Sequence, residues 1–252
     1  MITLQTEFAN RKGKILRGTV TLPGAAGPYP VVVNLHGFGG SRMGYKSMHV
    51  SMARELAAAG IACVRYDFYG NGESDGEFEE MTFTSLLEDS EDIWAWTLSQ
   101  NWCDRERMIL SGQSLGGFVA ASAAPRVSEK LLILMCPGAG MWFGCAERSR
   151  EMEKKGILFG DIEGLKFSHD FNYDLARYNP FEDAKGAPAE KVLIIRGTAD
   201  KLVDDRTCET YLALYPQGSV YKKIENANHN FASINHRREL NETIVSFIKE
   251  NI

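Results

Sequence analysis

Residues 112–116, Gly-Gln-Ser-Leu-Gly, decide what this chain folds into. They follow the apolar run 108–110 and precede the small-residue stretch 117–124, which predicts a strand, a sharp turn and a helix. A glycine two positions either side of a serine lets the backbone turn tightly and lifts the hydroxyl clear of the sheet. The alternative is a chance G-x-S-x-G in a loop. The strand and helix expected on either side favour a nucleophilic serine at position 114.

Short apolar segments alternate with longer helical ones on both sides of this stretch. This alternation is typical of a mostly parallel, twisted sheet with helices on both faces. Strands are expected at residues 3–9, 14–21, 31–35, 62–67, 108–110, 131–135, 191–196 and 220–224, and helices at 48–59, 84–99, 117–124, 206–215 and 235–251. The first two strands are expected to form an antiparallel hairpin. We therefore predict an α/β fold in which residues 1–252 form a single domain.

A long segment separates the expected strands at 131–135 and 191–196. Its roughly fifty residues are far more than one crossover helix needs. It begins with a charged helical piece at 147–155 and continues with an aromatic-rich piece up to Phe181. We predict that residues 137–185 form a lid inserted after the sixth strand. Such a lid would cover the carboxyl ends of the strands, where open α/β sheets bind their ligands.

A serine hydroxyl is a weak nucleophile, so Ser114 needs a base, and the base needs a group that orients it. After this kind of turn the expected chain order is serine, acid, histidine. Asp200 follows the strand expected at 191–196, and His229 follows the last strand. Loops that follow neighbouring parallel strands meet at one edge of the sheet. The sequence therefore predicts a catalytic triad of Ser114, Asp200 and His229.

The competing side chains have structural explanations. Asp204 and Asp205 fit the N-cap of the next helix. Four further histidines are His36, His49, His169 and His236. The first follows a strand in a glycine-rich loop, where a structural hydrogen bond suits it, and the others fall on helices or in the lid.

Acyl transfer develops negative charge on an oxygen, which two backbone N–H groups should meet. The first expected donor is the N–H of Leu115, the residue after the nucleophile, at the positive end of a helix. The second is the N–H of Phe38, in the loop after the strand at 31–35. Glycines flank Phe38 and let that backbone approach closely.

Several classes of function are disfavoured. The net charge of −5, without a basic run, argues against a nucleic-acid or anionic-membrane surface. No stretch approaches the ~18 apolar residues of a membrane helix, and no secretory signal is visible. The glycine-rich loops at 37–42 and 70–75 fit neither the dinucleotide nor the phosphate-loop pattern. No metal-ligand spacing is present, so no cofactor is expected. Five scattered cysteines indicate reduced thiols in a cytoplasmic protein.

The chain resembles the α/β-hydrolase superfamily over nearly its whole length. The resemblance rests on the loops at 36–40, 66–76, 112–116, 197–200 and 228–229, which occur in the family's order. Within the superfamily it is most similar to the compact bacterial cinnamoyl/feruloyl esterases. These commonly carry G-H-S-Q-G-G at the turn, whereas this chain has leucine at position 115. The resemblance implies a serine hydrolase that releases ferulic, coumaric or caffeic acid from sugar or alkyl esters.

The substrate contacts are expected in the lid. In the family, polar lid residues bind the phenolic hydroxyl, and the resemblance implies Asn172 or Tyr173 for that role. The aromatic side chains of the lid, Trp142 among them, have two interpretations: they stack on an aromatic acyl group of the substrate, or they form the core of the lid. The partner predicted is therefore a small-molecule ester, and an exposed apolar lid would also suit a homodimer.

The leading prediction is an esterase acting through an acyl-enzyme. A serine peptidase or thioesterase with the same triad is the alternative within enzymes. A catalytically dead hydrolase fold used for ligand binding is the alternative outside them. That last hypothesis predicts a broken triad, whereas every triad position is filled here.

Overall fold

The computed structural model describes all 252 residues and is organised around an eight-stranded sheet. The strand order is β1-β2-β4-β3-β5-β6-β9-β10. The strands are β1 (Ile2–Ala9), β2 (Ile15–Leu22), β3 (Tyr29–Leu35), β4 (Ala62–Tyr66), β5 (Cys103–Gln113), β6 (Leu131–Met135), β9 (Lys191–Gly197) and β10 (Val220–Ile224). β1 and β2 form the predicted antiparallel hairpin, β2 runs antiparallel to β4, and all other pairs are parallel. The predicted fold class is confirmed.

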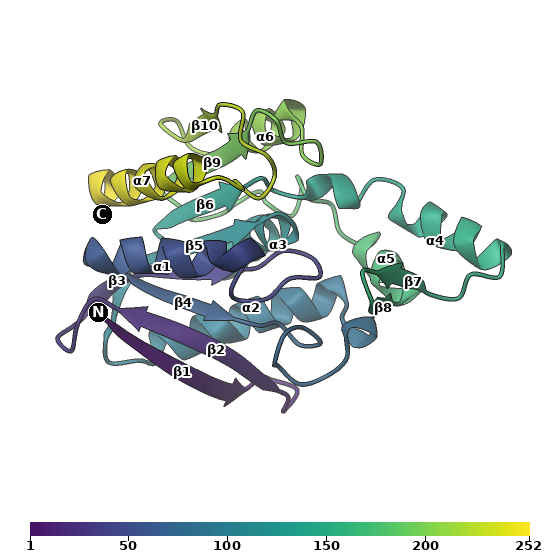
Figure 1. Ribbon diagram of the computed structural model, residues 1–252, viewed down its shortest axis with the longest axis horizontal. Coiled ribbons are helices and arrows are strands. Elements are labelled where there is room, and N and C mark those ends of the chain that lie inside the picture. Colours follow the sequence, from purple (N-terminus) through teal and green to yellow (C-terminus); the bar gives the residue numbers. More distant parts are fainter.

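Helices cover both faces of this sheet. They are α1 (Met48–Ala58), α2 (Phe83–Leu98), α3 (Leu115–Ala123), α6 (Asp205–Leu212) and α7 (Ile234–Asn251). α1 and α7 lie together on one face, and α2 and α3 pack against each other on the other (Figure 1). The prediction for α6 ran three residues too far. The chain tightens into i to i+3 hydrogen bonds at Leu214 and Tyr215, just before Pro216.

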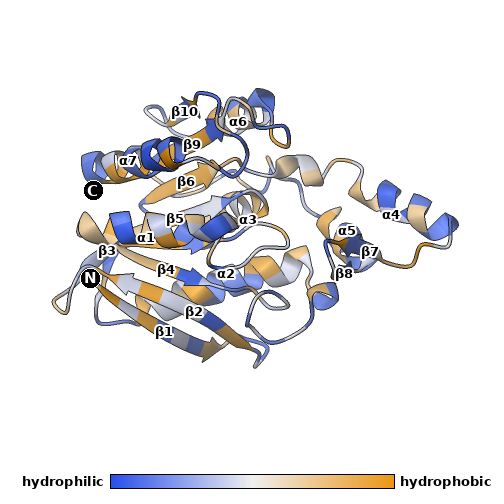
Figure 2. Cartoon of the chain, viewed as in Figure 1, coloured by the Kyte–Doolittle hydropathy of each residue, from blue (hydrophilic) through white to orange (hydrophobic).

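The central strands form the core of the molecule. β6 is buried along its whole length, and β9 is buried except at its first residue. Both strands are largely hydrophobic (Figure 2), as expected of parallel strands covered on both faces. No helix is both long and apolar enough to cross a membrane.

A separate group of short elements connects β6 to β9. It comprises α4 (Cys145–Lys154), the antiparallel strands β7 (Gly160–Ile162) and β8 (Leu165–Phe167), and α5 (His169–Leu175). We call residues 137–185 the insertion. It extends from the end of the sheet to which the arrowheads of the parallel strands point, while both termini lie at the other end (Figure 1). Thr84 at the start of α2 donates to Asp174 of α5 from both its N–H and its hydroxyl, at 2.7 and 2.8 Å.

Candidate active site

Ser114 lies in the sharp turn that the sequence predicted between β5 and α3. Its backbone angles, φ 55° and ψ −122°, lie outside the regions that ordinary residues favour. A β-carbon on Gly112 would lie 2.0 Å from the carbonyl oxygen of Gly116, and one on Gly116 would lie 2.3 Å from that of Leu35. Both glycines are therefore required by the close approach of strand, turn and helix.

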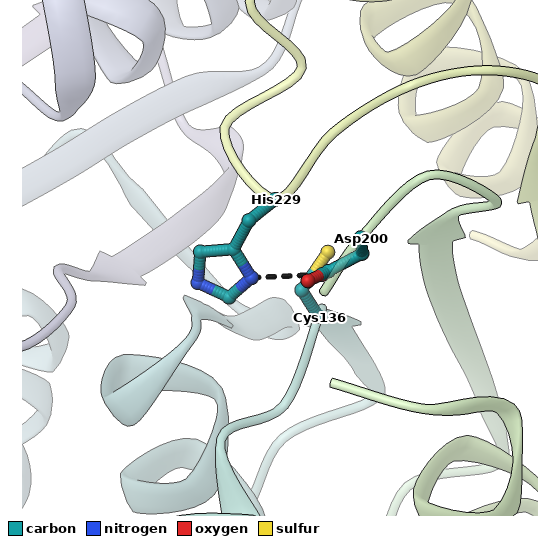
Figure 3. Close-up of side chains that lie close together, drawn as sticks. All are labelled: Cys136, Asp200 and His229. Carbon is teal, nitrogen blue, oxygen red and sulfur yellow. Dashed lines mark hydrogen bonds and ion pairs between the residues drawn. The ribbon is translucent and has the colours of Figure 1, made fainter. Parts of the chain in front are cut away.

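Asp200 and His229 meet at the carboxyl end of the sheet. His229 Nδ1 donates to Asp200 Oδ2 at 2.8 Å, and the second ring nitrogen points away from Asp200 (Figure 3). Asp200 Oδ1 accepts from the N–H groups of Leu202 and Val203, at 2.8 and 3.1 Å. Burial alone would raise the pKa of Asp200, but the hydrogen bonds from His229 and Leu202 outweigh it and lower the pKa to about 2. The carboxylate is therefore charged at neutral pH.

A buried arginine holds the loop that carries Asp200. Arg196, on β9, donates to the carbonyl oxygens of Asp200 and Val203 at 2.9 and 2.6 Å, and to Asp205 Oδ1 at 3.0 Å. These bonds join the end of β9 to both ends of the loop between β9 and α6. They leave the carboxyl group of Asp200 free to face His229.

Cys136 is a member of this cluster that the sequence reasoning missed. The Cys136 sulfur, a carboxyl oxygen of Asp200 and a ring nitrogen of His229 all lie within 4.8 Å of one another (Figure 3). Burial raises the pKa of the Cys136 thiol well above its usual value, and the charge of Asp200 adds to this. The 2.8 Å separation of the nitrogen and oxygen is that of a direct hydrogen bond. Two ligands of one Zn²⁺ at about 2.0–2.3 Å would stand farther apart.

The backbone around Ser114 places it beside this cluster. Its N–H donates to the carbonyl oxygen of Met135, the residue before Cys136, at 2.9 Å. Its own carbonyl oxygen accepts from the N–H of Gly138 at 2.8 Å. A β-carbon on Gly37 would lie 3.2 Å from Ser114 Cβ and 3.8 Å from Oγ, so the loop after β3 passes directly over the serine. Ser114 Oγ makes no hydrogen bond within the protein.

Two backbone N–H groups are available near Ser114, those of Phe38 and Leu115. Neither donates to another group of the protein. Gly138 borders Leu115 closely, because a β-carbon there would lie 3.0 Å from the Leu115 nitrogen. Leu115 begins α3, where N–H groups have no partner within the helix. The two donors that the sequence predicted are thus both unpaired, one directly after Ser114 and one in the loop that passes over it.

The Phe38 ring joins the loop after β3 to the insertion. It contacts Phe78, Phe167 and Phe171, with ring centroids 5.2, 5.4 and 5.6 Å away. Phe167 belongs to β8 and Phe171 to α5. The insertion therefore packs directly on the loop that carries one of the two free N–H groups.

The three lid residues predicted to bind substrate have other contacts in this structure. Tyr173 donates its hydroxyl to Glu153 at 2.6 Å, and Asn172 donates its amide to Ser149 at 2.9 Å, both on α4. Trp142 lies four residues after Gly138, half-buried, with its ring centroid 5.2 Å from that of Phe143. A role in substrate binding stays a prediction for all three.

Asp204 and two of the competing histidines have the structural roles that the sequence indicated, whereas Asp205 accepts from Arg196 and Lys223 and does not cap α6. Asp204 caps α6 by accepting from the N–H of Thr207 at 2.8 Å. His36 accepts from the N–H of Phe68 at 3.2 Å. His169 is buried within the insertion between Ser149 and the carbonyl oxygen of Ile157.

The sheet order, the serine turn and the acid and histidine loops are those of the α/β-hydrolase fold. A family model described as serine aminopeptidase, S33 (Hydrolase_4), matches residues 26–154, just over half of the chain, and the chain belongs to this family.

Individual relatives agree with this assignment. An uncharacterized 31.7 kDa Escherichia coli protein is 34% identical over 96 residues, which are 38% of this chain and 32% of that protein. The quorum-quenching protein AidA of Acinetobacter baumannii is 32% identical over 110 residues, 43% of this chain and 35% of that protein. The chain thus matches about a third of the length of these relatives. The structure of Est1E from Butyrivibrio proteoclasticus with ferulic acid bound superposes with a TM-score of 0.82 at 22% identity over 98% of both chains, which establishes the fold.

Proposed function

We propose that this protein is a serine carboxylic-ester hydrolase that cleaves hydroxycinnamoyl esters through an acyl-enzyme. The observation that carries the proposal is the hydrogen bond between a charged, buried Asp200 and His229, beside a serine in a strained turn. A carboxylate in this position fixes the imidazole tautomer that leaves Nε2 free to accept a proton.

In the first half of the reaction Ser114 Oγ attacks the ester carbonyl carbon while His229 Nε2 takes the hydroxyl proton. Asp200 stabilises the imidazolium that forms. The N–H groups of Phe38 and Leu115 donate to the carbonyl oxygen as it becomes negative. The tetrahedral intermediate collapses, and His229 passes its proton to the departing alcohol.

In the second half, water replaces the alcohol. His229 removes a proton from the water as its oxygen attacks the acyl carbon, and the same two N–H groups meet the second oxyanion. Collapse of this intermediate breaks the bond to Ser114 and releases the acid, and His229 returns the proton to the serine.

An aromatic acyl group is supported by the side chains near Phe38. Its neighbours from the chain around α2 and from the insertion are phenylalanines, and Trp142 follows the segment that borders Leu115. Aromatic walls favour flat apolar groups. The similarity to Est1E, whose structure holds ferulic acid, is one of fold and agrees with this choice.

A serine peptidase or thioesterase is the second candidate, and the description of the family as serine aminopeptidase favours it. An aminopeptidase must hold the α-ammonium group of its substrate, for which a carboxylate is the natural partner. The rings that surround Phe38 provide none, and Asp200 is already bound to His229. The ester is therefore the better fit.

The test is a substrate panel of methyl ferulate and other aryl esters, acyl-CoA thioesters and aminoacyl amides. We expect the aryl esters to give the highest kcat/KM, and Ser114→Ala to abolish their hydrolysis. Ser122→Ala is the matched control, because it removes a buried hydroxyl without a partner from α3. A preference for the amides, or activity that survives Ser114→Ala, would overturn the proposal.

A further inference from the structure

Gln113, the residue before the serine, joins the serine turn to the histidine loop. Its side chain is buried at the end of β5. Its Nε2 lies 3.3 Å from the carbonyl oxygen of His229 and 3.2 Å from Asn230 Oδ1, and donates to both. Its Oε1 lies 3.1 Å from His49 Nε2. One amide thus contacts the backbone of the proposed catalytic base and a fully buried histidine of α1.

The orientation of this amide follows from its neighbours. The carbonyl oxygen of His229 can only accept, so the NH₂ group of Gln113 must face it and the amide oxygen must face His49. His49 therefore carries its proton on Nε2. Burial lowers the pKa of His49 to about 3, so the ring is neutral and acts only as a hydrogen-bond donor.

The loop that carries His229 is held at its base by other bonds. The carbonyl oxygen of Ala227 accepts from the N–H of Ala199 at 2.9 Å, and Thr198 Oγ1 accepts from the N–H of Asn226 at 2.7 Å. Both bonds join this loop to the loop of Asp200. On the side of the His229 loop that faces β5 and Ser114, the side-chain hydrogen bonds to the loop come from Gln113.

We propose that Gln113 is a positioning residue for His229, and that His49 in turn orients Gln113. The inference rests on the proposed function, because it concerns the proton transfer between Ser114 and His229. Gln113 is covalently joined to the serine and hydrogen-bonded to the backbone of the base. This one residue therefore links the two groups that exchange the proton.

The position of His49 supports this role. A neutral, fully buried imidazole has an energetic cost unless its polar atoms are paired. His49 Nδ1 has no partner, so the bond to Gln113 is the single hydrogen bond of the ring. Hydrophobic packing would be served as well by leucine. The hydrogen bond to Gln113 is what a histidine adds at this place.

The first test replaces Gln113 by methionine, which keeps the volume and removes all three hydrogen bonds of the side chain. We expect kcat for an aryl ester and the rate at which a fluorophosphonate labels Ser114 to fall at least about tenfold, because small misplacements of reacting groups are costly. KM should change less than about threefold, since no substrate contact is lost. Ser111→Ala is the control, because it removes a buried hydrogen bond to Asn34 from the same strand and should leave kcat within about twofold.

The second test changes only the partner of Gln113. His49→Leu should lower kcat and the labelling rate, and His49→Gln, which can still donate to Oε1, should restore much of both. If Gln113→Met shows no cooperative thermal transition and so does not fold, the two His49 variants still test the inference. If wild type hydrolyses the ester and is labelled while Gln113→Met and His49→Leu match it, the inference is wrong and the proposed function stands. If wild type does neither, the proposed function itself fails.

Discussion

Two buried carboxyl groups lie at opposite ends of the sheet and differ in charge. Asp200 follows β9 at the carboxyl ends of the parallel strands, and Glu129 precedes β6 at their amino ends. The pKa of Asp200 is lowered to about 2, whereas burial raises the pKa of Glu129 to about 8. Both groups are removed from water, so burial does not explain the difference.

Hydrogen-bond donors explain it. His229 and two backbone N–H groups donate to Asp200. Neither carboxyl oxygen of Glu129 has a partner at normal hydrogen-bond geometry, and burial outweighs the weak pull of the backbone N–H groups of Glu129 and Ala189 on its pKa. One end of the sheet is built to hold a negative charge in the protein interior, and the other end is not. This difference agrees with the proposed active site at the carboxyl ends of the strands.

The largest effect should come from removing the charge of Asp200. Asp200→Asn keeps the size of the side chain but can present an NH₂ group to His229 Nδ1, which then favours the wrong tautomer. We expect kcat for an aryl ester to fall by about 10³–10⁴ with the fold retained. Asp204→Asn, four residues away and still able to cap α6, is the control and should stay near wild type. Similar losses of kcat in both variants would show that the charge of Asp200 has no special role.

The second largest effect concerns the packing around the serine turn at the carboxyl end of the sheet. Gly116→Ala places a β-carbon 2.3 Å from the carbonyl oxygen of Leu35, whereas Gly140→Ala, at the start of the insertion, meets nothing within 4 Å. We expect Gly116→Ala to lose more than about 4 kcal/mol of unfolding free energy and Gly140→Ala to lose almost none. Denaturant unfolding measures both. Equal stabilities would show that the turn has room to relax.

The amino end of the sheet is tested by the pH dependence of stability. The pKa of Glu129 in the folded state, about 8, lies above its ordinary value of 4.5, so the folded protein binds more protons than the unfolded chain between these pH values. The unfolding free energy should fall as pH rises through this window, by up to about 5 kcal/mol at about 1.36 kcal/mol per pKa unit. Glu129→Gln should remove this slope in urea titrations at pH 5, 7 and 8.5. If the unfolding free energies of wild type and Glu129→Gln change with pH in parallel, the pKa of Glu129 is not raised in the folded protein.

The smallest effect is expected in the insertion. Tyr173→Phe removes an exposed hydrogen bond to Glu153, so stability should change by less than about 0.5 kcal/mol. If Tyr173 binds the phenolic hydroxyl, as the resemblance implies, KM should rise a few-fold for methyl ferulate and stay constant for methyl cinnamate, which lacks that hydroxyl. The same KM ratio as wild type would remove Tyr173 from the substrate site.

The sheet could be predicted because buried parallel strands appear as continuous apolar runs, as in β6 and β9. The turn at Ser114 could be predicted because only glycine fits at positions 112 and 116. The contact between Asp200 and His229 followed from their places after neighbouring strands.

Other features could not be predicted from local patterns. β7 and β8 have three residues each, too few to show a period of two. Cys136 is a single residue after a strand and belongs to no motif. The bonds of Gln113 depend on α1 and on the histidine loop, which are far away in the sequence. The partners of Asn172 and Tyr173 depend on how α4 packs against α5.

In the proposed function, His229 and Asp200 activate Ser114 as a nucleophile. The most direct measurement is fluorophosphonate labelling of the folded protein, followed by mass spectrometry of its peptides. We expect one phosphonyl adduct, on Ser114, which is absent in Ser114→Ala and forms far more slowly in His229→Ala. An unlabelled wild type, an adduct on another residue, or undiminished labelling of Ser114→Ala would contradict it.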